Sequence, residues 1–227
     1  MKLAGLQKLT LLDYPGRTAC TVFLPGCNLR CPFCHNSQLI GEAGALEEEE
    51  LFALLEKRRG ILDGVCVTGG EPLLHPDAPA LLRRIKAAGY AVKLDTNGFF
   101  PDALAAVLTE GLADYVAMDI KASPARYARA CGLPAVDVAP VARSAALLRE
   151  SGLDYELRTT VVCQLHAPGD FAEIGRWLAG APRYFLQAFV DSAQVPFAGL
   201  TAPDRAYLEQ CRQNALPYLP NTQLRGV

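Results

Sequence analysis

The chain has no run rich in lysine and arginine, and its 22 basic residues are nearly balanced by 24 acidic ones. This lack of a basic patch argues against nucleic-acid binding. No apolar stretch reaches the roughly 18–20 residues that a membrane span requires. The first residues, Met1 to Leu6, also lack the long apolar core and the cleavage site of a signal peptide. We therefore expect a cytoplasmic protein that binds neither nucleic acid nor a membrane.

Internal repeats, low-complexity segments and an interdomain linker are also absent. The length of 227 residues suits one α/β domain with a full-sized core, and a hydrophobic content of 51% argues against disorder. We predict a single domain over residues 1–227. A reducing cytosol would keep the eight cysteines from forming disulfides.

Apolar strand-like runs alternate with helical patterns along most of the chain. The predicted strands are Thr18–Leu24, Gly64–Thr68, Tyr90–Asp95, Asp114–Ile120, Tyr155–Val162 and Tyr184–Phe189. The predicted helices are Leu46–Arg58, Asp77–Ala88, Pro101–Thr109, Pro140–Glu150, Asp170–Leu178 and Pro203–Asn214. Alternation of this kind predicts parallel strands with right-handed crossovers, in an α/β fold.

Three cysteines, Cys27, Cys31 and Cys34, have a C-x3-C-x2-C spacing directly after the first predicted strand. Pro25-Gly26 ends that strand, so the cysteines are expected on a loop at its carboxyl end. Three thiolates in so short a loop can converge on one metal centre, and soft sulfur ligands favour zinc or an iron–sulfur cluster. A structural zinc site needs four ligands, which His35 could complete. A four-iron cluster held by three cysteines would keep one iron free for a small molecule.

This spacing resembles the signature of the radical S-adenosylmethionine (SAM) enzymes. The continuation Cys34-His35-Asn36 is similar to the glycyl-radical-enzyme activases of that superfamily. The segment Asp13-Tyr14-Pro15-Gly16 resembles the Asp-x-Pro-Gly that activases carry before their first strand. With tyrosine at its second position, it looks most like the anaerobic ribonucleoside-triphosphate reductase activating proteins.

The resemblance implies a fold, a cofactor set and a reaction. The fold would be a partial (β/α)6 barrel of parallel strands, whereas periodicity alone also allows an open doubly wound sheet. Cys27, Cys31 and Cys34 would hold a [4Fe–4S] cluster and thereby take part in catalysis. The enzyme would cleave SAM reductively there and generate a glycyl radical on a partner enzyme. That partner would be the anaerobic ribonucleotide reductase, and the electron donor a flavodoxin- or ferredoxin-like protein.

The motif Gly69-Gly70-Glu71-Pro72 directly follows the second predicted strand. It resembles the Gly-Gly-Glu motif that holds the amino group of SAM, so Gly69, Gly70 and Glu71 are candidate SAM-binding residues. Glu71 could accept a hydrogen bond from that ammonium group or brace the turn. A plain strand-to-helix turn is the alternative for the whole motif.

Two further segments, Asp95-Thr96-Asn97-Gly98 and Asp119-Ile120-Lys121, follow the next two predicted strands. They resemble Asp-Thr-Asn-Gly and Asp-Leu-Lys in the activases, where they line the SAM pocket, so Asp95, Asn97, Asp119 and Lys121 are candidates. The resemblance also implies a possible monovalent cation on Asp95, Thr96, Asp119 and the carbonyl of Ala117, because oxygen ligands suit a hard cation. An Asx turn is the alternative at Asn97.

Two candidates lie in the last two predicted strands. Arg158 could meet the carboxylate of SAM or of the partner protein, or form a structural pair with Glu156. Formate-lyase activases carry a histidine near Phe189 that helps to hold the adenosyl group. This chain has no histidine there, and Gln187 is the candidate replacement, which weakens the assignment to the formate-lyase branch.

Three alternatives to reductase activation remain open. The chain could activate another glycyl radical enzyme, of the pyruvate formate-lyase type. It could be a radical SAM enzyme on a small molecule, of the 7-carboxy-7-deazaguanine synthase type, although the Cys-His-Asn continuation argues against this. It could also be a zinc-binding module without catalysis.

Overall fold

The computed structural model describes residues 1–226, so the predicted domain end at residue 227 lies outside them. The chain divides into two compact units. The first contains Met1–Asn28, Gln38–Thr96 and Asp102–Ala117, and the second contains Leu29–Ser37, Asn97–Pro101 and the residues from Met118 onward. Across residues 1–226 we find no helix with the length and apolar character needed to cross a membrane.

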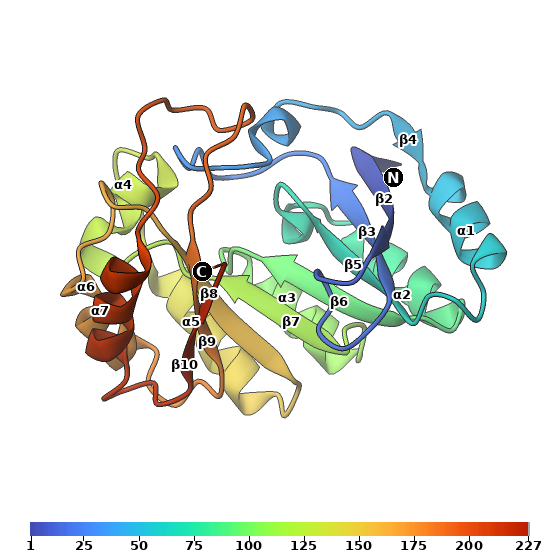
Figure 1. The fold of residues 1–227 in the computed structure, drawn as a ribbon. Helices are drawn as coiled ribbons and strands as arrows, with labels where there is room; N and C mark the ends of the chain where they lie inside the picture. The colour runs from blue at the N-terminus through green and yellow to red at the C-terminus, as the bar shows by residue number, and fades with distance from the viewer. Residues whose placement is uncertain (227) are drawn as a thin grey trace. The chain divides into compact units, whose positions relative to one another are not determined.

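The first unit is built on parallel strands with one antiparallel neighbour (Figure 1). Strand β2 (Gly5–Thr10) runs antiparallel to β3 (Ala19–Leu24), which pairs in parallel with β5 (Gly64–Gly69), and β5 pairs in parallel with β6 (Ala91–Thr96). The remaining elements are β1 (Lys2–Leu3), which pairs with β4 (Leu46–Glu47), the 3-10 helices η1 (Ser37–Ile40) and η2 (Pro72–Leu74), and the helices α1 (Glu48–Lys57), α2 (Ala78–Ala87) and α3 (Pro101–Thr109). The register pairs Leu24 with Gly69, so the carboxyl ends of β3 and β5 lie together.

The second unit repeats the parallel arrangement. Strand β8 (Tyr155–Val161) pairs with β9 (Tyr184–Ala188), and β9 pairs with β10 (Thr222–Arg225). Strand β7 (Tyr115–Asp119) contributes residues to both units. The remaining elements are the 3-10 helix η3 (Pro124–Arg126) and the helices α4 (Tyr127–Cys131), α5 (Ala139–Glu150), α6 (Asp170–Trp177) and α7 (Arg205–Ala215). Helices α6 and α7 pack side by side (Figure 1).

Local sequence explains where the helices begin. At α1 the backbone N–H of Glu47 donates to Glu50 Oε1 at 3.3 Å, and acidic residues fill the first turn, where they favour the positive end of the helix dipole. Glu48 also forms ion pairs with the N-terminal amine and with Arg84. At α7 the carboxylate of Asp204 accepts from the N–H of Tyr207 at 2.7 Å.

All six predicted strands and all six predicted helices are confirmed, with bounds that shift by a few residues. Strands β1, β2, β4 and β10, the three 3-10 helices and the short helix α4 were not predicted, and β4 occupies Leu46–Glu47, which were predicted as the start of the first helix. Six-residue β2 has three exposed positions and little apolar character. Strand β10 has the sequence Thr-Gln-Leu-Arg, which does not by itself predict a strand.

Candidate functional site

The cysteine loop begins in the first unit, where backbone hydrogen bonds hold its entry. The N–H of Gly26 donates to the carbonyl of Leu39 at 2.7 Å. The ring nitrogen Nε2 of His75 donates to the carbonyl of Pro25 at 2.5 Å. These contacts fix the two residues that precede Cys27, so the chain enters the loop in one conformation.

The Gly-Gly-Glu motif packs directly against this entry. The N–H groups of Gly70 and Glu71 donate to the carbonyls of Leu24 and Gly26 at 2.9 and 2.8 Å. A Cβ added at Gly70 would lie 1.8 Å from the carbonyl oxygen of Gly26 and 3.2 Å from Cys27 Cβ. A side chain is therefore excluded at Gly70, and also at Gly69, where the φ is 130° and a Cβ would lie 2.2 Å from the carbonyl oxygen of Leu24.

Glu71 braces the ends of two neighbouring strands. Its side chain is buried, and Oε1 accepts from the N–H of Leu73 at 3.0 Å and from the hydroxyl of Thr96 at 2.8 Å. Thr96 is the last residue of β6, whereas Glu71 follows β5. Of the two roles considered for Glu71, these contacts support bracing of the turn.

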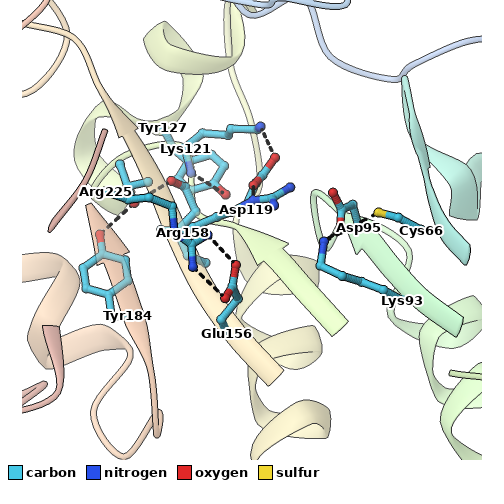
Figure 2. A network of polar contacts seen from close by, with 12 residues as sticks. Cys66, Lys93, Asp95, Asp119, Lys121, Tyr127, Glu156, Arg158, Tyr184 and Arg225 are labelled. Atoms are coloured by element: carbon cyan, nitrogen blue, oxygen red, sulfur yellow. Dashed lines mark hydrogen bonds and ion pairs between the residues drawn. The ribbon is translucent and has the colours of Figure 1, made fainter. Parts of the chain in front are cut away.

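The candidate residue Asp95 has a partner that the sequence analysis did not single out. Asp95 forms an ion pair with Lys93, whose side chain is only 2% exposed. The ammonium group of Lys93 also lies 3.7 Å from Cys66 Sγ on the adjacent strand (Figure 2). The only available signal was a lysine two positions before an aspartate inside an apolar run, which places both on one face of a strand.

Cys31 and Cys34 belong to the second unit, where the end of α4 holds their loop. The N–H of Arg30 donates to the carbonyl of Cys131 at 2.9 Å, and a Cβ at Gly132 would lie 2.0 Å from the carbonyl oxygen of Arg30. A hydrogen bond with Cys131 lowers the pKa of the Cys31 thiol to about 7; burial opposes this shift and the charge of Lys121 supports it. Burial raises the pKa of Cys34. A thiol with a lowered pKa is suited to metal ligation, because the thiolate is the ligating form.

Asp119, Lys121 and Arg158 form one charged cluster in the second unit (Figure 2). Asp119 accepts from Lys121 Nζ at 2.9 Å and from Arg158 Nε at 2.5 Å. Burial alone would raise the pKa of Asp119, but the charges of Arg158 and Lys121 outweigh it and hold that pKa far below its usual range. Lys121 also acts electrostatically on Cys31 and Cys34, so this cluster lies beside that part of the cysteine loop.

His166 is a buried residue of this region that sequence reasoning missed. Its Nδ1 accepts from the N–H of Val162 at 3.0 Å, so Nε2 carries the proton and donates to the carbonyl of Lys121 at 2.7 Å. Burial lowers the pKa of His166, which keeps the ring neutral for this role. The histidine therefore fixes the backbone of Lys121.

The other predicted residues lie in a turn, in two strands and in the cysteine loop. Asn97 Oδ1 accepts from the N–H of Phe99 at 3.1 Å, which is the Asx turn named as the alternative. Ala117 is fully buried in β7. Gln187 lies in β9, in register with Thr160 and Arg225. His35 forms a hydrogen bond of 2.6 Å between Nε2 and the carbonyl of Val190.

Glu156 forms an ion pair with a residue that the sequence analysis did not single out, Arg225. Glu156 is buried, and Arg225 donates to both of its carboxylate oxygens, at 2.9 and 3.1 Å (Figure 2). The guanidinium of Arg225 also lies 3.8 Å from the ring centroid of Phe185. The C-terminal strand thus supplies a charge to the strands of the site, although the sequence of the tail carries no signal for this.

Replacing Arg225 with glutamine should destabilise the protein by about 1–3 kcal/mol, since a buried carboxylate loses a bidentate partner that is itself partly exposed. Urea unfolding would measure the change. Arg59→Gln is the matched control, because Arg59 pairs with Glu56 in an exposed contact, and its replacement should leave the stability nearly unchanged. Equal losses in the two variants would contradict a structural role for Arg225.

Comparison with known proteins identifies the fold and the family. A domain of pyruvate-formate lyase-activating enzyme from Bacteroides vulgatus superposes with a TM-score of 0.57 and 20% identity, over 72% of this chain and 99% of that one. Streptococcus suis SuiB bound to S-adenosylmethionine superposes with a TM-score of 0.67 and 14% identity, over 91% of this chain and 52% of that one. The fold is thus α/β with a mostly parallel sheet, consistent with the partial barrel core of radical SAM enzymes, and the predicted fold class is confirmed.

The sequence profile of the Radical SAM superfamily matches residues 21–175, more than half of the chain. The chain belongs to the radical SAM superfamily.

Curated relatives support the activase group within this superfamily. A protein of Methanocaldococcus jannaschii, provisionally named a glycyl-radical enzyme activating enzyme, is 28% identical over 99% of this chain and 96% of its own length. The pyruvate formate-lyase-activating enzyme of Clostridium pasteurianum is 34% identical over 53% of this chain and 52% of its own length. The 7-carboxy-7-deazaguanine synthase of Aquifex aeolicus is 34% identical over 33% of this chain and 34% of its own length. The chain therefore spans only about half or less of the last two relatives.

The family implies a [4Fe–4S] cluster and SAM, and three cysteine thiols are the donor chemistry that such a cluster requires. None of Cys27, Cys31 and Cys34 forms a disulfide, and the pKa of Cys31 is lowered. In the first unit the Gly69-Gly70 backbone lies against the Cys27 loop with no side chain between them. Over residues 1–226, no group of three or more His, Cys, Asp or Glu side chains forms a ready metal-ion site.

Proposed function

We propose that this protein is a radical SAM activase that generates a glycyl radical on a partner enzyme. The observation that carries the proposal is the match to a glycyl-radical enzyme activating enzyme over nearly the full length of both chains. Matches to 7-carboxy-7-deazaguanine synthases have higher identity in places, but the Aquifex aeolicus enzyme aligns with only a third of this chain. Similarity of the whole chain favours the activase over the small-molecule enzyme.

The chain's own residues have distinct roles in this proposal. Cys27, Cys31 and Cys34 would hold the cluster, which when bound supplies one electron for the reductive cleavage of SAM. Gly69 and Gly70 let this turn pack closely against the entry of the cysteine loop, where its backbone would meet the amino group of SAM, and Glu71 keeps that turn rigid. Lys121 and Arg158, both held by Asp119, would present positive charge to the carboxylate of SAM, with Asn97 and Gln187 as further polar groups.

The first candidate for the partner is the anaerobic ribonucleotide reductase, with a flavodoxin- or ferredoxin-like electron donor. The support is the Asp13–Gly16 segment with Tyr14, together with the absence of a histidine near Phe189. In the structure the ring of Tyr14 is buried against Gly64, and Asp13 Oδ2 accepts from the hydroxyl of Thr21 at 2.5 Å. These two side chains therefore make contacts within the protein. The segment supports the partner assignment through its resemblance to the reductase activating proteins, and not through a direct contact with the partner.

The experiment mixes the reduced, reconstituted protein with SAM and an anaerobic ribonucleotide reductase, and records the electron paramagnetic resonance spectrum. We expect the doublet of a glycyl radical on the reductase. The Cys34→Ala variant serves as the control and should give no doublet, because the cluster would lose a ligand.

Other outcomes separate the alternatives. A doublet on a pyruvate formate-lyase and none on the reductase would keep the activase and change the partner. Cleavage of SAM with no radical on any glycyl radical enzyme would contradict the activase and favour a small-molecule substrate. Reconstituted protein that holds zinc and no iron would contradict both.

A further inference from the structure

The pair Lys93–Asp95 is an internal ion pair in β6 of the first unit. The exposed fractions of the two side chains are 2% and 13%. Residues two apart on a strand point to the same face, so the ammonium of Lys93 reaches Asp95 along its own strand. Cys66 pairs with Lys93 in register on β5, and its sulfur lies 3.7 Å from the ammonium (Figure 2).

A carboxylate as buried as Asp95 requires a positive charge nearby, because desolvation of an unpaired charge costs several kcal/mol. A bound monovalent cation could meet this need, and so could a lysine. In this chain a lysine does so from the middle of the strand, where its long side chain is enclosed by the core. Lys93 therefore places one unit of positive charge at Asp95.

The side chains of Thr96 and Asp119, also considered for a cation, are engaged within the chain. The hydroxyl of Thr96 donates to Glu71 Oε1, and in the second unit Asp119 accepts from both Lys121 and Arg158. Each of the two carboxylates already has a cationic side chain bonded to it. The negative charges of Asp95 and Asp119 are therefore balanced by lysine and arginine side chains of the protein itself. These residues do not fit an added monovalent cation.

We propose that the ammonium group of Lys93 takes the place of a monovalent cation at Asp95, so that the protein needs no bound potassium or sodium. The ammonium has the same charge as such an ion, and it is tethered covalently. It therefore loses no translational entropy on binding and cannot be exchanged with solvent. The charge balance at Asp95 is thus independent of the salt around the protein.

The test compares the melting temperature of the reconstituted protein in tetramethylammonium chloride with that in potassium or sodium chloride. Tetramethylammonium is too bulky for a site lined by carboxylate oxygens. The wild-type protein should melt at the same temperature in all three salts. Lys93→Met should melt lower by on the order of 10 °C in tetramethylammonium, and potassium or ammonium ions should restore part of the loss.

The first unit offers a matched control in Lys86, which pairs with Asp114 at 2.6 Å with about a third of each side chain exposed. Lys86→Met makes the same chemical change, but water can solvate Asp114, so a small loss without selective recovery in potassium is expected. The double variant Lys93→Met, Asp95→Asn removes both charges and should lose the response to potassium.

If Lys93→Met does not fold, the wild-type protein alone still tests whether a bound cation is needed. A rise in its melting temperature with potassium but not with tetramethylammonium would overturn the proposal, as would an about tenfold dependence of SAM affinity on potassium. A folded Lys93→Met variant that potassium does not stabilise selectively would also overturn it. The melting measurement involves neither SAM nor a partner protein, so its result is independent of the proposed activase function.

Discussion

Replacing any one of Cys27, Cys31 or Cys34 with alanine should abolish the iron–sulfur cluster. The wild-type chain is expected to hold about four irons after anaerobic reconstitution, because three thiolates are the protein's whole share of the ligands. Removing one thiolate leaves two irons of the cluster without a protein ligand, and such a cluster should not survive desalting. Iron and sulfide analysis, with the visible absorbance of the cluster, would measure the loss.

Two cysteines outside the C-x3-C-x2-C loop, Cys163 and Cys131, provide the controls for this experiment. Cys163→Ala should keep the full iron content, since its thiol lies in the turn after β8 and burial raises its pKa. Cys131→Ala is the more demanding control, because Cys131 forms a hydrogen bond with Cys31 and is fully buried. Iron loss in Cys131→Ala as complete as in Cys31→Ala would show that the ligand assignment is wrong.

The parts of the fold that sequence predicts are those with a strong local pattern. Strand β5 reads Gly-Val-Cys-Val-Thr-Gly, and helix α2 ends before Gly89, whose φ of 90° suits glycine alone. Strand β10 has no such pattern and exists because it pairs with β9. Strand β10 therefore depends on tertiary contacts, and no local sequence pattern predicts it.

In the candidate site, too, some residues follow from a local sequence pattern and others are found only in the structure. The glycine and aspartate motifs were found because they directly follow apolar strands, where the carboxyl ends of parallel strands meet. Arg225 was missed because its partner Glu156 is 69 residues away in the sequence. Lys93 was missed because a strand that is buried on both faces gives no reason to expect a charge within it, and only the structure shows that Asp95 compensates for that charge.

Gly70→Ala should destabilise the protein by roughly 3 kcal/mol or more and reduce the iron that the chain retains. The new Cβ would meet the carbonyl oxygen of Gly26 at 1.8 Å, and backbone cannot move aside as a flexible side chain can. Relief requires the Gly-Gly-Glu turn to separate from the entry of the cysteine loop, which would displace Cys27. Urea unfolding and iron analysis of the same preparation would measure the two effects.

Alanine variants at three other glycines of the first unit distinguish the effect of the close contact with Gly26 from the effect of backbone strain. Gly41 has open space and no left-handed φ, so Gly41→Ala should change stability by less than about 0.5 kcal/mol. Gly60 has a φ of 76° with nothing near it, so Gly60→Ala measures the conformational term alone, about 1 kcal/mol. Gly69 combines a φ of 130° with a Cβ contact of 2.2 Å to Leu24, and Gly69→Ala should be at least as damaging as Gly70→Ala. If Gly70→Ala is no worse than Gly60→Ala and keeps its iron, the close approach to Gly26 is not what holds Cys27 in place.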